Sequence, residues 1–281
     1  MKVRFVIFIS VCGFWGVSQT IYGQDDTEAD SILYEAADTL GLLRTVNEVD
    51  RLITMIYSGS GTKLLNGETC EMDAYRASLR YAIPDTEHPF PVPGMRVDFT
   101  CAENGSESVR YVQVVAGQYA WDQDEPGGPA VAVPTSLRER LLQLWLVPQG
   151  VVKAALEAGD EVVLSREMEN PVLAFPLPAP LDDIVLRATF DPEVFLYHTM
   201  PNGFRHEFSH RLIHVSAEFD GTLVEVTFDD YQDWNESDYK ADVLLPGRIV
   251  QKSDGTVVMD LTLSVSNTYN PYVVMPLPEN L

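Results

Sequence analysis

Apolar residues recur at helical spacing in two parts of the chain, with acidic or other polar residues between them. Between residues 27 and 43 this pattern predicts an amphipathic N-terminal helix. A second helical stretch opens at Ser136, and Glu139 three positions later completes a capping-box pattern. Pro148 is typical of the first turn of a helix, and Gly159 is typical of the residue that ends one. We therefore expect one N-terminal helix and a central helical pair.

Most of the remaining sequence alternates apolar and polar residues, as half-buried strands do. In the first half this alternation predicts strands at residues 52–57, 75–81, 95–101, 108–116 and 118–122. The first of these strands is expected to end at Tyr57, ahead of the Ser-Gly-Ser-Gly run at residues 58–61. From residue 161 onward, strands should be separated by turns at 201–203, 220–221 and 253–255. The run at 204–215 also alternates, which indicates one long strand reaching to the turn at 220–221. In the last strand, one face should carry Val257, Met259, Leu261, Leu263 and Val265.

Strands on both sides of a central helical pair indicate an α+β fold. We expect a curved, mostly antiparallel β-sheet, half-barrel-like, with the N-terminal helix and the central helical pair packed on one face. The proline-rich stretches at 91–94 and 171–180 are too short and too apolar to separate domains. Residues 24–281 are therefore expected to form a single β-rich domain.

The first residues have the layout of a secretion signal. Lys2 and Arg4 precede an almost wholly apolar stretch at 5–18, after which the sequence turns polar. This stretch is shorter than the roughly 20 residues that a spanning helix needs, and no later segment is long enough. We expect residues 1–23 to be a signal peptide, and the protein to be periplasmic or extracellular and not membrane-spanning.

Charge and cysteine content narrow the partners and the compartment. The formal net charge is −23, with 42 acidic and 19 basic residues, so the surface should repel phosphate backbones and nucleic acid is not an expected partner. Cys70 and Cys101 are the two cysteines beyond the leader. An even number in an oxidising compartment predicts a disulfide between them, with unpaired thiols or a mixed disulfide as the alternative. No motif indicates a cofactor.

The segment His206-Glu207-x-x-His210 matches the zinc-protease signature, with His214 four positions further on. On a helix, His206 and His210 would bind zinc while Glu207 activates the metal-bound water. Strand periodicity in this segment opposes that geometry, because residues four apart on a strand lie about 13 Å apart. A strand would instead place His206, His210 and His214 in a row on one face, where they could sense pH, bind a metal weakly or simply be half-exposed.

A curved sheet roofed by helices at 136–158 predicts an apolar cavity on its concave face. Its expected lining is Tyr119, Trp121, Leu141, Trp145 and Val152. The alternative is that these side chains fill a core and leave no cavity.

Four local phrases, at residues 54–62, 111–121, 142–150 and 247–252, resemble the uncharacterised N-terminal domain that precedes a metallo-β-lactamase-fold domain in some exported bacterial proteins. The resemblance covers most of residues 35–278, and its motifs are structural. The metal-binding His-x-His-x-Asp-His of the lactamase-like domain is missing from the sequence, so no catalytic residue carries over. In architecture the expected fold is also loosely similar to the periplasmic lipoprotein carriers, which hold acyl chains in a half-barrel.

Three functions remain in competition. The first is an exported, non-catalytic binding or accessory module that holds a hydrophobic small molecule, a lipid or a partner protein in the concave sheet. The second is a zinc-dependent hydrolase that uses His206, Glu207 and His210. The third, which follows from the resemblance, is a structural companion subunit of a separately encoded metallo-β-lactamase-fold enzyme.

Overall fold

A computed structural model describes residues 25–42, 52–65, 67–81, 92–102, 108–199, 203–233, 244–267 and 271–279. The expected signal peptide at residues 1–23 lies outside this part of the chain. Helix α1 (Asp25–Thr39) comes first. Six strands follow: β1 (Thr54–Leu65), β2 (Glu68–Arg80), β3 (Gly94–Ala102), β4 (Val109–Ala116), β5 (Tyr119–Gln123) and β6 (Val131–Ala132).

Two helices with short 3-10 turns at their outer ends divide the strands into two groups: η1 (Pro134–Ser136), α2 (Leu137–Trp145), α3 (Pro148–Ala158) and η2 (Gly159–Glu161). The second group comprises β7 (Val163–Glu167), β8 (Asn170–Pro176), β9 (Val185–Asp191), β10 (Leu196–Thr199), β11 (Arg205–Phe208), β12 (Arg211–Phe219), β13 (Thr222–Asp229), β14 (Gln232–Asp233), β15 (Leu244–Leu245), β16 (Arg248–Ser253) and β17 (Thr256–Asn267).

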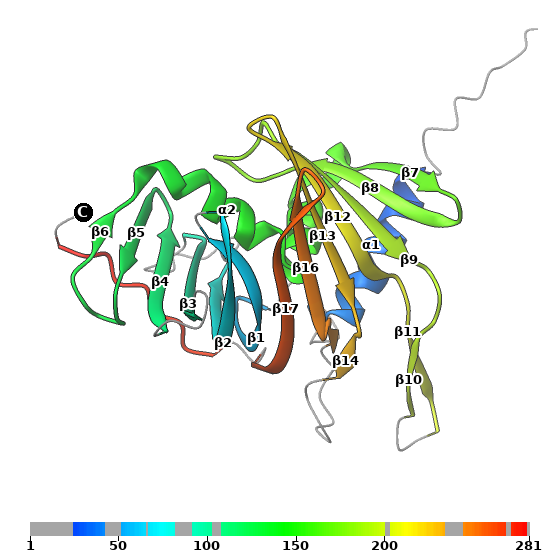
Figure 1. Ribbon diagram of the computed structural model, residues 1–281. Helices are drawn as coiled ribbons and strands as arrows, with labels where there is room; N and C mark the ends of the chain where they lie inside the picture. The colour runs from blue at the N-terminus through cyan, green and yellow to red at the C-terminus, as the bar shows by residue number, and fades with distance from the viewer. Residues whose placement is uncertain are drawn as a thin grey trace, which may run out of the picture.

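Thirteen of the described strands form one antiparallel sheet, in the order β6-β5-β4-β3-β2-β1-β17-β16-β13-β12-β9-β8-β7. The first six strands meander on one side of the β1–β17 pair, and the later strands extend on the other side (Figure 1). Because α2 and α3 connect β6 to β7, the helical pair runs from one edge of the sheet to the other. Helix α2 contacts β3, β4 and β5, whereas α3 contacts β8 and α1.

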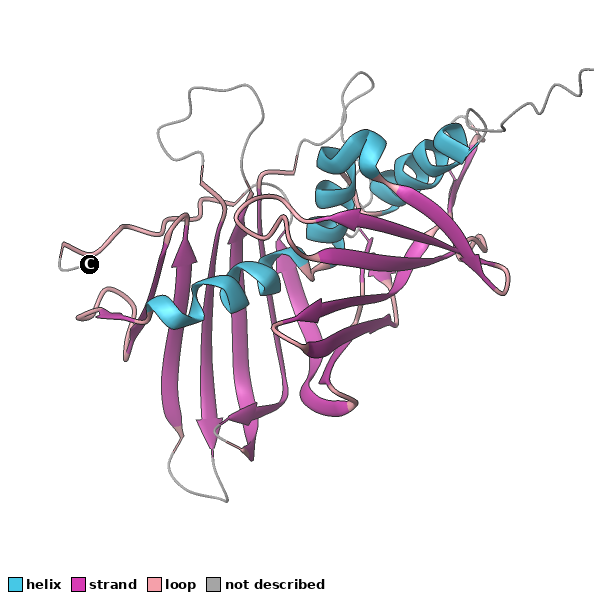
Figure 2. Ribbon diagram, turned by 90° about the horizontal axis from the view of Figure 1, so that it is seen from above, coloured by secondary structure: helices cyan, strands magenta, loops and turns pink. Residues whose placement is uncertain are grey.

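The helices lie on one face of the sheet, as Figure 2 shows, and the main core fills the space between them and the strands. This core includes Leu33 and Ala37 from α1, Leu141 from α2, and Phe175 and Phe190 from the second strand group. The α+β fold class expected from the sequence, a curved antiparallel sheet with an N-terminal helix and a central helical pair on one face, is confirmed. Within the described residues no helix has the length and apolar character that crossing a membrane requires.

The first strand does not end ahead of the Ser-Gly-Ser-Gly run, which corrects the sequence-based expectation. The run lies in the middle of β1, which continues to Leu65 and pairs with β2 on one side and β17 on the other. The register shifts at Ser58/Gly59 against β17 and at Gly59/Gly61 against β2, so the strand bends there without leaving the sheet. A Cβ atom on Gly61 would lie 1.9 Å from the carbonyl oxygen of Asp260 on β17. The two glycines therefore permit a bend and a close approach, not a chain reversal.

Two smaller expectations also fail for local reasons. Ser136 makes no side-chain cap hydrogen bond, because the preceding 3-10 turn holds it at φ −92° and ψ 3°, away from the extended conformation of a capping residue. In β17, register shifts at both ends turn the chain over, so Val257 and Val265 are exposed while Leu261 and Leu263 are buried. The five alternating residues therefore do not share one face.

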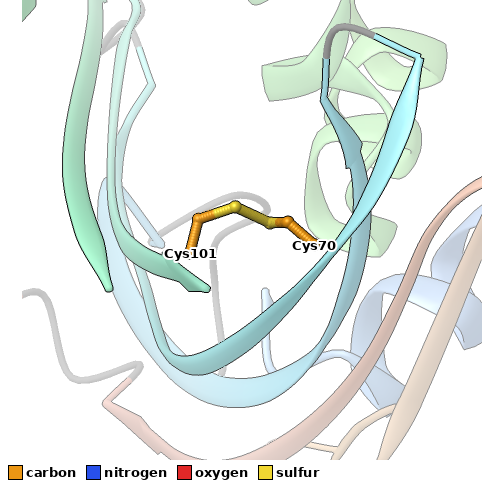
Figure 3. The surroundings of a disulfide bond; sticks show 2 residues. All are labelled: Cys70 and Cys101. Carbon is orange, nitrogen blue, oxygen red and sulfur yellow. A yellow bond between two sulfur atoms is a disulfide. The ribbon is translucent and has the colours of Figure 1, made fainter. Parts of the chain in front are cut away.

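Cys70 on β2 and Cys101 on β3 form the predicted disulfide, with Cα atoms 5.5 Å apart. Figure 3 shows the bond joining the two strands. Both side chains belong to the main core, so the bridge lies inside the protein and not on its surface.

Replacing Gly61 with alanine should lower the free energy of unfolding by about 1–3 kcal/mol, because the new methyl group has no room beside β17. The measurement is urea unfolding. Ser60→Ala is the control, since Ser60 is an exposed neighbour in the same strand. Equal stability of the two variants would show that β1 does not approach β17 this closely.

Reducing the disulfide should lower the free energy of unfolding by about 2–4 kcal/mol, because the bridge links residues 31 positions apart and restricts the unfolded chain. The measurement compares oxidised and reduced wild-type protein in urea. The Cys70→Ala, Cys101→Ala double variant, which should not respond to reductant, is the control. A wild-type midpoint that does not move with reductant would contradict this contribution.

Candidate functional site

A cavity of about 470 Å³ lies between α2 and the concave face of the sheet. Its apolar wall comes mainly from strands on both sides of the β1–β17 pair: Leu64, Leu65, Tyr75, Met95, Val97, Val115, Phe219, Val224, Val258 and Met259, with Leu142 from α2. The polar groups on the wall are Lys63, Gln113, Ser136, Glu139, Arg140, Gln143, Asp220, Thr222, Gln251 and Ser253. The wall of the cavity is thus mixed, with apolar and polar side chains in nearly equal number. Small-molecule sites likewise combine apolar surface with polar groups that orient the ligand.

Helix α2 presents its mixed face to this cavity. Ser136, Glu139, Arg140 and Gln143 follow the three- and four-residue spacing of one helical face. The Arg140 side chain holds this face in place: its Nη1 donates to the carbonyl oxygens of Val114 (3.1 Å) and Trp121 (2.8 Å), and its Nη2 lies 2.5 Å from Oδ1 of Asp122. The guanidinium therefore ties α2 to β4 and β5.

Lys63 is a charged group of the cavity wall that takes no part in the hydrogen bonds of Arg140. Its Nζ lies 5.0 Å from the centre of the Phe99 ring, and Phe99 in turn stacks on Tyr111. Burial lowers the pKa of the Lys63 ammonium, the negative charge of Glu139 opposes that shift, and the positive charge of Arg140 adds to it.

None of the five residues predicted to bind a ligand lines the cavity. Trp121 pairs with Val114 on the opposite face of the sheet, where both belong to a small separate core that includes Met275. Tyr119 is part-exposed, two residues before Trp121 on that same face. Leu141, Trp145 and Val152 are buried in the main core. These three side chains therefore fill the core, which was the alternative expectation from the sequence.

The sequence pattern did not predict the residues that line the cavity, because the apolar face of α2 was expected to face it. That face packs into the core, so the cavity falls beside the polar stripe that begins at Ser136. The available signal was this stripe, together with a lysine in an otherwise apolar strand end at Lys63-Leu64-Leu65.

Residues 204–215 form neither a helix nor one long strand, which corrects the strand expectation. They belong to β11 and β12, and the extended conformation is interrupted between these strands at Ser209 and His210, where His210 has φ +52°. The break removes the predicted row of histidines: His206 Nε2 lies 2.6 Å from Oδ2 of Asp38, and His214 lies 3.5 Å from Glu225.

His210 and Ser209 dock on α1. His210 Nδ1 lies 2.7 Å from Oε2 of Glu35, and the Ser209 hydroxyl donates to the same oxygen at 2.6 Å. A second cavity of about 290 Å³ lies beside this cluster and is also lined by Glu207. Ser209 and Glu35 contact the same ring nitrogen of His210, so the three residues lack the relay of a nucleophile, a base and an orienting acid.

The geometry gives the zinc-hydrolase alternative no support. The His-Glu-x-x-His motif needs one helical face, and here its two histidines lie on either side of a strand break and face different acids of α1. Among the residues that the structure describes, no three His, Cys, Asp or Glu side chains gather as a metal site would require.

Comparison with known proteins gives similarity to solved structures but not to a family model. No protein-family model matches the chain, and no curated protein matches it. Among solved structures, the chain is similar to a LolA superfamily protein, NE2245 from Nitrosomonas europaea, with 13% sequence identity, coverage of 90% of this chain and 96% of that chain, and a TM-score of 0.41. The resemblance to the domain ahead of a metallo-β-lactamase fold stays a prediction.

Replacing Glu35 with alanine should lower the free energy of unfolding by about 1–3 kcal/mol, because Ser209 and His210 both lose their partner on α1. Asp30→Ala is the matched control, since Asp30 is an exposed acid on the same helix. Urea unfolding should leave that control within about 0.5 kcal/mol of the wild type. If the two variants lose the same stability, the cluster does not hold β11 and β12 to α1.

Proposed function

We propose that this chain is an exported, non-catalytic module that binds a hydrophobic small molecule in the cavity under α2. The observation that carries the proposal is the cavity itself, a space of about 470 Å³ on the concave face of the sheet, in whose wall apolar side chains lie beside polar ones. Its volume falls within the roughly 300–1,000 Å³ of typical ligand sites.

The form of the lining supports binding more than catalysis. Arg140, which a reaction could otherwise use, is occupied by two backbone carbonyls and Asp122. Glu139 and Lys63 approach the cavity from different elements, α2 and β1. The arrangement thus offers apolar surface next to polar groups that can orient a ligand.

Export is supported by the disulfide and by the signal-like first residues. The Cys70–Cys101 bridge is buried between adjacent strands, and structural bridges of this kind persist in oxidising compartments. A module that binds a hydrophobic molecule outside the cytoplasm would shield it from water. The companion-subunit alternative needs no internal space, so the cavity favours ligand binding over that role.

Filling the cavity should weaken binding of a hydrophobic ligand. Gln113→Trp places an indole into the cavity from β4, and we expect the affinity for the apolar fluorescent dye N-phenyl-1-naphthylamine to fall at least about tenfold, since one tenfold step costs only about 1.4 kcal/mol. The measurement is fluorescence titration of the mature protein.

The matched control is Leu223→Trp. Thr222 and Val224 line the cavity, so Leu223 between them points away from it and is 45% exposed. This variant should bind the dye as the wild type does. Dye affinity that is unchanged by Gln113→Trp, or a wild-type protein that does not bind the dye, would contradict the proposal.

A further inference from the structure

Lys63 forms no ion pair within the described part of the chain, although acids outnumber bases in the sequence by 42 to 19. Many of the described arginines form ion pairs, among them Arg110 with Asp98, Arg138 with Asp183, Arg187 with Glu167, Arg211 with Asp191 and Arg248 with Asp260. Lys63 forms no ion pair with a described carboxylate, and its ammonium contacts the Phe99 ring. An ammonium placed among apolar side chains is unfavourable unless a counter-charge reaches it.

Gln251 is a second group of the cavity whose side chain has no hydrogen-bond partner among the described residues. Its side chain lines the cavity and is only 8% exposed, and no described residue accepts from or donates to its amide. Lys63 pairs with Met259 across the β1–β17 ladder, and Met259 pairs with Gln251 across the next ladder. The three residues therefore lie side by side on one face, with a charge and an amide on either side of a thioether.

The other charged groups that line the cavity form no ion pair with Lys63, so a ligand anion can reach its ammonium. Arg140 is occupied by Val114, Trp121 and Asp122. Glu139 acts on Lys63 through its charge from α2 but forms no ion pair with it. Asp220 is exposed at the turn between β12 and β13.

We propose that the ligand is a single-chain amphiphile with an anionic headgroup, such as a fatty-acid carboxylate, whose head is bound over Met259 by Lys63 and Gln251. This inference rests on the proposed function and specifies its ligand class. The alkyl chain lies along the apolar wall that Met95, Val97 and Leu142 provide. Lys63 supplies the opposite charge, and the Gln251 amide donates a hydrogen bond to a headgroup oxygen.

The test compares dodecanoate with dodecanol, which share a chain and differ in headgroup charge. Each is titrated against the dye N-phenyl-1-naphthylamine bound to the mature protein. Wild type should bind dodecanoate about tenfold more tightly than dodecanol, and Lys63→Met should abolish this preference by weakening dodecanoate alone. Lys63→Arg keeps the charge and should retain the preference.

Lys252→Met is the matched control, because it removes the same charge at a position that does not line the cavity. Lys252 lies on β16 between the cavity-lining Gln251 and Ser253, so its side chain points to the other face of the sheet. It should keep the preference for dodecanoate. Gln251→Leu should weaken dodecanoate binding several-fold and leave dodecanol unchanged.

The outcomes separate the two proposals. If dodecanoate and dodecanol bind equally and Lys63→Met changes neither, the anionic-headgroup inference is wrong and hydrophobic binding stands. If neither compound displaces the dye and the dye itself does not bind, the proposed function fails and this inference fails with it. A loss of preference that Lys252→Met reproduces would assign it to net charge and would also overturn the role of Lys63.

Discussion

The pairing of β1 with β17 is the interaction on which the rest of the structure depends. It joins the six-strand meander that follows α1 to the strands that follow the central helices, and so makes one sheet out of two sequence-distant groups. Gly59 and Gly61 make it possible, because any side chain there would collide with the carbonyl oxygens of Thr262 and Asp260. The same bend curves the sheet and creates the concave face over which α2 and α3 pass.

The candidate site follows from this junction. Beyond the bend, β1 brings Lys63 into line with Met259 and Gln251, and α2 closes the space above them. Two sets of contacts hold helix α2 over this space. Leu141 and Trp145 pack into the core, and Arg140 donates hydrogen bonds to backbone carbonyls of β4 and β5. The cavity remains open where the apolar face of the helix ends, since the mixed face does not fill the space above the strands.

The protease-like motif has a structural explanation in this fold. The break at Ser209 and His210 turns the chain from the β10–β11 ribbon into the main sheet, and the side chains on both sides of it contact acids on α1. Thr39 adds a hydrogen bond from the end of α1 to the carbonyl oxygen of Ser209. The residues that match the zinc-protease signature thus have a structural role here: their polar side chains hold the irregular backbone between β11 and β12 against α1.

The sequence by itself determined the class of the fold, the helices, most strands, the closing hairpins and the disulfide, because these depend on local periodicity, turn residues and cysteine count. It predicted a concave cavity near the central helices, but not its lining. Alternation along a strand gives two faces without saying which is concave, and so Trp121 was assigned to the wrong face. Only the tertiary structure decided that Gly59 and Gly61 bend a strand, that bulges reverse part of β17, and that Lys63 and Gln251 meet in one cavity. The pairing of β1 with β17 joins segments from opposite ends of the domain, and no local pattern specifies the register between them.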